Sequence, residues 1–190
     1  MDKLTNEEFF KKHAAPGRVG LVGGSALIDK AIRKLQNPLV KDGGESLWSH
    51  AFLFSEKRID ECQWVIESDL DFRHKQTRLG VQENRINKYY DEKLFPNVAV
   101  LDFDLSDKKT KLVLTGALSL LSELTKYSVR ELAGTLLAIY NPTLRSKKNL
   151  LSLNNTFYCS AMVQHCYSKA GIIFSEDIDI KNMTLEDIAS

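Results

Sequence analysis

Cysteine is scarce in this chain, and neither sign of charge dominates it. The three cysteines (Cys62, Cys159 and Cys166) form an odd set without a Cys-x-x-Cys pair, which excludes a disulfide framework and a standard zinc site. The formal net charge of +1 gives no electrostatic footprint for nucleic acid or for an anionic membrane. We therefore expect reduced thiols, no metal or other cofactor, and no nucleic-acid partner.

Long apolar runs are missing as well. Residues 1–13 contain acidic side chains and no apolar run of about 7 to 15 residues, so they do not form a secretory signal. The most apolar window, residues 112–121, is interrupted by Thr115, Gly116 and Ser119 and is far shorter than the roughly 20 residues that span a bilayer. We predict a soluble protein without a transmembrane segment, either cytoplasmic or exported by a route that needs no cleavable signal.

What the chain does contain is ordinary globular composition, with 43% hydrophobic and 27% charged residues. Length and composition predict one domain over residues 1–190. Thr5 and Glu8 form a capping-box pattern that predicts a short helix. Further strands are expected at residues 18–22, 48–54, 63–69 and 98–105, and further helices at 26–35, 106–126, 128–141 and 154–171.

The helix expected over residues 154–171 contains the first candidate for chemistry. Its polar start (Asn154, Asn155 and Thr156) places Cys159 in the first turn, where free N–H groups and the helix dipole stabilise a thiolate. Cys159 also shares an apolar stripe with Met162, Val163, Cys166 and Ala170, so it should point inward. Buried cysteines are commonly inert, and we interpret Cys166 as a core residue and Cys62 as incidental.

A hairpin upstream supplies a candidate base. Strands 48–54 and 63–69 are joined by a charged stretch, and a register centred between Arg58 and Ile59 pairs Phe54 with Gln63, Phe52 with Val65, and His50 with Glu67. Opposed side chains have Cβ atoms about 4.5 to 5.5 Å apart, so the imidazole and the carboxylate can meet. A slip of one residue would send them to opposite faces, and Glu61 and Asp69 are the alternative acids.

These residues match the needs of cysteine hydrolysis, which requires a thiolate, an imidazole, a group that orients the imidazole, and N–H donors for the oxyanion. Cys159, His50 and Glu67 are the candidates, with the backbone N–H of Cys159 as an oxyanion donor. His165 lies six residues from Cys159 on a different helix face. His13 and His74 lie in polar surroundings with no partner pattern.

Three other segments have competing interpretations. Gly23, Gly24 and Ser25 precede a helix and could cradle an anion, but no Gly-Lys-Ser/Thr follows, which favours a plain tight turn. The polar insertion at residues 70–97 could cover a substrate or bind phosphate, although its mixed acids and bases favour a solvated loop with a short helix. The apolar side chains of the helical pair within residues 106–141 are expected to pack in the core or against a partner.

The run Cys159-Ser160-x-x-Val163-x-x-x-Tyr167-x-x-x-Gly171-Ile172 resembles the nucleophile helix of the NlpC/P60 cysteine peptidases, which belong to the papain-like group. In the ordinary family the cysteine precedes the histidine. Here Ser49-His50-Ala51-Phe52 comes first, which is similar to the circularly permuted branch, the papain-like amidases of the YaeF/YiiX type related to lecithin-retinol acyltransferases. The run Val65-Ile66-Glu67-Ser68 resembles the strand that carries the third, acidic member in that branch.

The resemblance implies an α+β, papain-like fold in which a small antiparallel sheet packs on the nucleophile-bearing helix, with additional helices. It also implies an amidase or peptidase with a Cys-His-Glu triad and no cofactor. The implied substrate is a peptide, a peptidoglycan fragment or an N-acyl amide, with the stem-peptide bond of the bacterial cell wall as the first expectation. Because no signal peptide is expected, such an enzyme would be an exported effector or would act on cytosolic wall fragments.

The chain also departs from the family. Gly17-Arg18 stands where the family has a Gly-Asp before its first strand, and residues 70–97 and 106–141 resemble local elaborations. Two alternative functions therefore stay open. One is a lipid acyltransferase or thioesterase with the same Cys159 and His50, which predicts an apolar tunnel beside Cys159 walled by residues 112–124. The other is a catalytically silent ligand-binding module. The sequence specifies no inhibitory partner protein.

Overall fold

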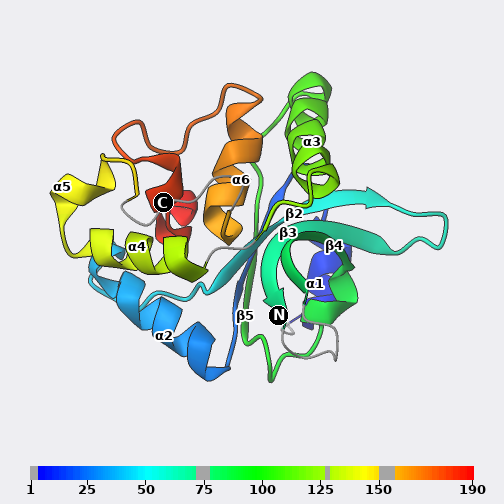
Figure 1. Ribbon diagram of the computed structural model, residues 1–190. Helices are drawn as coiled ribbons and strands as arrows, with labels where there is room; N and C mark the ends of the chain where they lie inside the picture. Colours follow the sequence, from blue (N-terminus) through cyan, green and yellow to red (C-terminus); the bar gives the residue numbers. More distant parts are fainter. Residues whose placement is uncertain (1–3, 72–77, 127–128, 150–156) are drawn as a thin grey trace.

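The computed structural model describes residues 4–71, 78–126, 129–149 and 157–190, which have an α+β fold. One antiparallel sheet has the strand order β4-β3-β2-β1-β5 (Figure 1). The strands are β1 Val19–Gly23, β2 His50–Lys57, β3 Gln63–Asp71, β4 Arg78–Arg85 and β5 Asn97–Leu101. The prediction of a small antiparallel sheet with additional helices is confirmed.

Seven α-helices occur in the described residues, together with three short 3-10 turns. The helices are α1 Asn6–His13, α2 Leu27–Gln36, α3 Asp107–Ser122, α4 Val129–Ile139, α5 Pro142–Arg145, α6 Cys159–Ser168 and α7 Leu185–Ala189, and the turns are η1 Asn37–Leu39, η2 Ile86–Tyr89 and η3 Ile180–Asn182. The capping box of Thr5 and Glu8 begins α1 as predicted. Within the described part of the chain, no helix has the length and apolarity needed to cross a membrane.

Alternate residues of the central strands face two hydrophobic clusters, one on each side of the sheet, because successive side chains of a strand point to opposite faces. The cluster under α3 and α6 includes Leu21, Ala51, Leu53 and Ile66. The cluster on the other face, which involves α1 and η2, includes Phe10, Val22, Phe52, Phe54, Val65 and Tyr89. Burying each of the larger side chains among them contributes about 1.5–3 kcal/mol, so packing on both faces stabilises the sheet.

Helix α6 packs on the sheet and along α3 (Figure 1). The two helices approach closely at Gly116, where an added Cβ would lie 3.4 Å from the Cα of Cys166. Beside this contact, the hydroxyl of Tyr167 donates a 2.6 Å hydrogen bond to the carbonyl oxygen of Gly17. The predicted polar start at Asn154 to Thr156 lies outside the described residues. The predicted stop agrees with the left-handed backbone of Gly171, whose φ is +72°.

The register of the hairpin differs from the prediction. Leu53 lies opposite Ile66 and Phe54 opposite Val65, so the predicted pairing of His50 with Glu67 is wrong by two residues. The reason is that β2 continues into the stretch expected to be loop, and its register shifts between Phe54 and Lys57. A shift of two residues keeps every side chain on its predicted face, since the side-chain period of a strand is two.

The solvated loop predicted for residues 70–97 is wrong over much of its length. Arg78–Arg85 forms β4, which pairs with β3 along the edge of the sheet, and Ile86–Tyr89 forms η2. Residues 72–77 lie outside the described part of the chain. Val81, Ile86 and Tyr89 are buried, so this stretch contributes to the core even though its overall composition is polar.

Candidate active site

Cys159 is the first residue of α6, with Tyr158 as the N-cap residue. The N–H of a first-turn residue has no acceptor within its own helix, so it is available to a ligand. The flanking side chains fix the position of Cys159, because the Tyr158 hydroxyl and the Ser160 hydroxyl both donate to the carbonyl oxygen of Met183, at 2.9 and 2.8 Å. Cys159 itself is only 5% exposed.

His50 is the first residue of β2, and its side chain is hydrogen-bonded to that of Glu67 and interacts with that of Cys159. Its Nε2 lies 2.7 Å from Glu67 Oε2, which leaves Nδ1 as the ring nitrogen for the thiol. Burial alone lowers the pKa of His50, but the hydrogen bonds with Cys159 and Glu67 outweigh it and raise that pKa well above 6.5. An imidazolium beside a thiol favours the thiolate.

Glu67, on β3, is fully buried and is surrounded by hydrogen-bond donors. Its Oε2 accepts from Tyr89 and contacts His50, and its Oε1 accepts from Asn84 at 2.7 Å and from Lys88 at 2.8 Å. Burial raises the pKa of Glu67, but the Lys88 charge and the hydrogen bond to His50 outweigh it and hold the pKa well below 4.5. The carboxylate is therefore ionised and is fixed on both oxygens.

The structure thus brings together the three residues predicted from the sequence and adds three that the sequence reasoning missed. Asn84 comes from β4, and Lys88 and Tyr89 come from η2. Burial and the charge of Glu67 raise the pKa of Tyr89 well above 10, so its hydroxyl stays protonated and donates. The signal that could have found this group was the apolar Val81, Ile86 and Tyr89 within a polar stretch, a pattern that favours packing on the core.

Among the remaining candidates, Cys166, His165 and Glu61 take no part in the contacts of this group that the structure shows. Burial raises the pKa of Cys166 to about 12, which makes it an inert core thiol, as interpreted from the sequence. The ring of His165 packs against Phe157, with centroids 4.9 Å apart. Of the alternative acids, Glu61 is exposed in the hairpin turn. Asp69 forms an ion pair with Lys88, while His74 lies outside the described residues.

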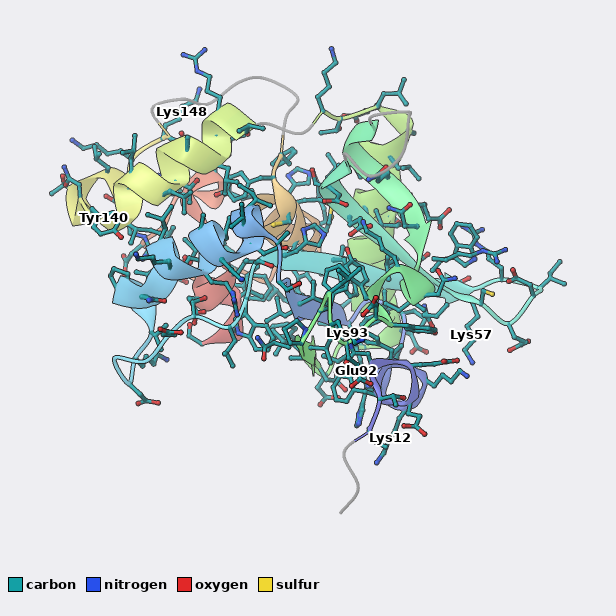
Figure 2. All side chains as sticks on the ribbon, turned by 90° about the horizontal axis from the view of Figure 1, so that it is seen from below. Lys12, Lys57, Glu92, Lys93, Tyr140 and Lys148 are labelled. Carbon is teal, nitrogen blue, oxygen red and sulfur yellow. The ribbon has the colours of Figure 1, made fainter. Side chains whose placement is uncertain are left out.

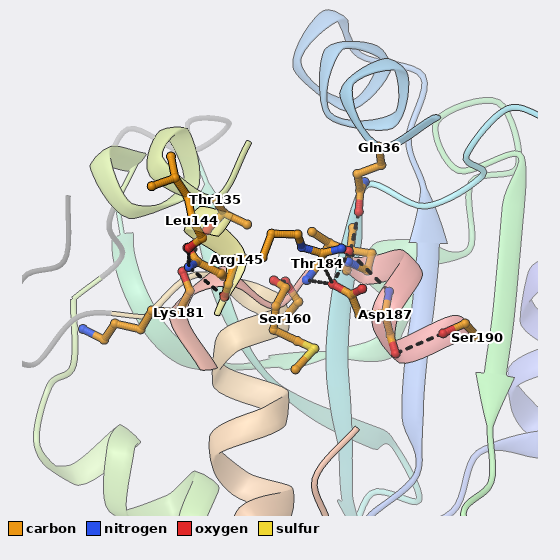
Figure 3. A network of polar contacts seen from close by, with 12 residues as sticks. Gln36, Thr135, Leu144, Arg145, Ser160, Lys181, Thr184, Asp187 and Ser190 are labelled. Carbon is orange, nitrogen blue, oxygen red and sulfur yellow. Dashed lines mark hydrogen bonds and ion pairs between the residues drawn. The ribbon is translucent and has the colours of Figure 1, made fainter. Parts of the chain in front are cut away.

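A small cavity of about 20 Å³ adjoins Cys159, which is space for about one water molecule. Its walls come from α2, α4 and the segment that contains α7, and its lining residues include Ile32, Ser49, Leu132, Leu136, Tyr158 and Leu185. Gln36 holds the C-terminal segment against this cavity, because its side-chain oxygen accepts a 3.0 Å hydrogen bond from the N–H of Leu185 (Figure 3). The same network contains the ion pair of Arg145 with Asp187.

The glycine turn at Gly23 and Gly24 lies at one side of this cavity, since the Gly24 N–H donates to Ser49 Oγ at 2.9 Å. The carboxylate of Asp29 packs directly over Gly24 and accepts from the Ala26 N–H at 3.2 Å. The Asp29 carboxylate already occupies the position that a bound anion would take, and its charge would repel the anion. The turn therefore has a structural role and does not bind phosphate.

A comparison with models of known protein families finds no match, and a comparison with curated proteins finds none either. Among the described residues, no group of three or more histidine, cysteine, aspartate or glutamate side chains could hold a metal ion. The interpretation of the site therefore rests on its geometry.

Proposed function

We propose that this protein is a cysteine hydrolase that cleaves an amide bond with Cys159, His50 and Glu67. The observation that carries the proposal is the His50 imidazole, which interacts with the Cys159 side chain and is hydrogen-bonded to the buried, ionised Glu67. A thiol, a base and an orienting carboxylate in hydrogen-bond contact are the recurring arrangement of nucleophilic catalysis.

The reaction would proceed in two steps. Cys159 Sγ attacks the amide carbonyl carbon, and the carbonyl oxygen takes up the negative charge near the N–H of Cys159. The C–N bond then breaks as the His50 imidazolium gives its proton to the leaving amine. In the second step, His50 accepts a proton from water while the water oxygen attacks the thioester, which releases the acid and restores the thiol.

We further propose that the fold is that of the circularly permuted NlpC/P60 branch, with a peptide or a peptidoglycan stem peptide as the substrate. The order of His50 on β2 before Cys159 on α6, and the packing of α6 on an antiparallel sheet, support this assignment. The departures at Gly17-Arg18, residues 70–97 and residues 106–141 concern parts outside the nucleophile helix.

Two measurements test the hydrolase. First, the protein and Cys159→Ala are incubated with purified peptidoglycan and with a panel of N-acyl amides, and the products are read by mass spectrometry. We expect products only with the unaltered protein. Second, iodoacetamide labelling at neutral pH is read by peptide mapping, and we expect Cys159 to react before Cys62 and Cys166. Equal labelling of Cys62 and Cys159 in the folded protein would contradict an activated thiol.

A second candidate, a lipid acyltransferase or thioesterase, is favoured by the apolar residues beside Cys159. The cavity there is lined by Ile32 of α2 and by Leu132 and Leu136 of α4. Residues 112–124, which were expected to wall such a tunnel, do not line this cavity, whose lining residues come from α2, α4 and the C-terminal segment. Helices α2 and α4 also run side by side (Figures 1 and 2) and carry the exposed side chains of Leu27, Ile28 and Leu137. Hydrolysis of acyl thioesters or lipid esters without peptidoglycan cleavage would select this candidate.

A further inference from the structure

We propose that Lys88 is a positioning residue that keeps Glu67 ionised and so holds His50 in its working state. This proposal rests on the proposed function, because it assigns Lys88 to the same site. Lys88 belongs to η2 and lies outside the segments on which the family resemblance rests. Its role follows from the contacts of its ammonium group.

The ammonium group of Lys88 joins two carboxylates. Its Nζ lies 2.8 Å from Glu67 Oε1 and forms a second ion pair with Asp69. The Lys88 side chain is 17% exposed, and its Nζ lies 5.2 Å from the centroid of the Tyr89 ring. A lysine so enclosed, with two acidic partners, is held in one place instead of moving freely in solvent.

Lys88 and His50 bind different oxygens of Glu67. His50 and Tyr89 contact Oε2, whereas Lys88 and Asn84 contact Oε1. Lys88 therefore does not compete for the oxygen that orients the imidazole, and its influence on His50 passes through the carboxylate. For that reason it is a positioning residue and not a catalytic one.

The charges around Glu67 explain why a cation is needed. Glu67 is fully buried, and burial favours the protonated form of a carboxyl. The other titratable groups that face it are His50, Tyr89 and, through Lys88, Asp69. Without the Lys88 charge, Glu67 would be left near the negative charge of Asp69 with only Tyr89, Asn84 and His50 as partners, and it would take up a proton at a higher pH. A neutral Glu67 no longer stabilises a protonated His50.

The experiment uses Lys88→Met, which keeps a long side chain without its charge. Lys88→Arg restores the charge, and Tyr89→Phe removes a hydrogen bond to Glu67 without a change of charge. The first readout is the imidazole titration of His50, followed by NMR in the Cys159→Ala background, where no catalysis is required. We expect Lys88→Met to move the His50 midpoint to lower pH by about one pH unit or more, and Lys88→Arg to restore it.

The second readout is the rate at which iodoacetamide labels Cys159 across the pH range. In Lys88→Met we expect little loss at pH 6 and a larger loss, up to about tenfold, at pH 8, since lowering the His50 midpoint by one pH unit reduces the protonated fraction tenfold only at pH values above both midpoints. Tyr89→Phe should lower the rate with much less change in the shape of the profile. If Lys88→Met does not fold, Lys88→Gln replaces it, and circular dichroism checks each variant.

Three outcomes separate the two proposals. An unchanged or raised His50 midpoint in Lys88→Met overturns the role of Lys88, even if the protein hydrolyses amides. A loss of labelling that is uniform at all pH values also overturns it, because that pattern indicates a structural role. A lowered midpoint that Lys88→Arg restores supports the role of Lys88, even if no hydrolysis is found and the proposed function fails.

Discussion

His50 Nε2 and Glu67 Oε2 lie 2.7 Å apart on neighbouring strands, and the carboxylate is fully buried. Both carboxylate oxygens are occupied by donors from β2, β4 and η2. A carboxylate held in this way fixes the ring nitrogen of His50 that faces it and leaves the other ring nitrogen for a second partner. The orientation of the His50 ring is thus set by residues of the sheet and of η2.

Replacing Glu67 with Gln tests whether this orientation matters. Glu67→Gln keeps the size of the side chain but removes the charge that favours a protonated His50. We expect the rate of Cys159 labelling to fall by about two orders of magnitude or more, and the free energy of unfolding to fall by about 3–5 kcal/mol because a buried ion pair is broken. The exposed Glu56 on β2 provides the control. Glu56→Gln should leave both quantities unchanged, and equal effects at the two positions would contradict the prediction.

The pKa shifts predict a defined pH dependence of folding stability. The pKa of His50 is raised above 6.5, because its hydrogen bonds outweigh burial, so its contribution is complete below pH 6.5 and is lost as pH rises through the folded-state pKa. The pKa of Glu67 is lowered from 4.5, chiefly by Lys88 against the effect of burial, so its contribution is complete above pH 4.5 and is lost as pH falls below that value. Between these two values both contributions are present.

Urea unfolding at pH 5.5, 7.5 and 9 measures this dependence. We expect the free energy of unfolding to decrease from the first pH to the last, and the decrease to be smaller in His50→Gln, which does not titrate. A decrease of the same size in both proteins would assign the pH dependence to other groups.

The sequence predicted the placement of Cys159, His50 and Glu67 better than it predicted the sheet around them. Cys159 at a helix start, and His50 and Glu67 on one face of a hairpin, follow from local periodicity, and a register error of two residues left that face unchanged. The error arose because the shift of register between Phe54 and Lys57 has no reliable local signal in the sequence. The other partners of Glu67, which are Asn84, Lys88 and Tyr89, depend on tertiary structure.

The polar stretch at residues 78–89 shows why the partners of Glu67 could not be predicted from the sequence. Asn84 and Lys88 are typical surface residues by composition, and here they lie against a buried carboxylate. Their placement comes from the pairing of β4 with β3, with Val65 opposite Asn84. A long-range pairing of this kind cannot be read from periodicity, because it depends on which strand covers the edge of the sheet.

The contact between α3 and α6 at Gly116 leads to a third prediction. An added Cβ would lie 3.1 Å from Lys169 Cγ, which belongs to a flexible side chain that can move, and 3.4 Å from the Cα of Cys166. We expect Gly116→Ala to be neutral or to stabilise the helix by up to about 1 kcal/mol. Gly116→Val adds methyl groups toward the backbone of α6 and should cost about 1–3 kcal/mol.

The displacement of α6 should also move Cys159, so Gly116→Val is expected to slow its labelling while Gly116→Ala does not. Thermal unfolding and labelling rates measure the two effects. A Val variant as stable and as reactive as the Ala variant would show that α6 is not held by this contact.

The fourth prediction separates the peptide substrate from the lipid one. Leu136 lines the small cavity beside Cys159, whereas Leu137, the next residue of α4, is 63% exposed. Leu136→Ala removes apolar side-chain atoms from the wall of the cavity, and Leu137→Ala makes the same chemical change on the outside of the helix.

If an apolar acyl chain enters here, Leu136→Ala should change the ratio of kcat/KM between long and short acyl thioesters by about tenfold, since a methylene group in a pocket is worth about 1–3 kcal/mol. Leu137→Ala should leave that ratio unchanged. If the substrate is a peptide whose acyl part lies elsewhere, neither variant alters the ratio, and Leu136→Ala shows only the loss of stability expected from a half-buried leucine, about 1–2 kcal/mol.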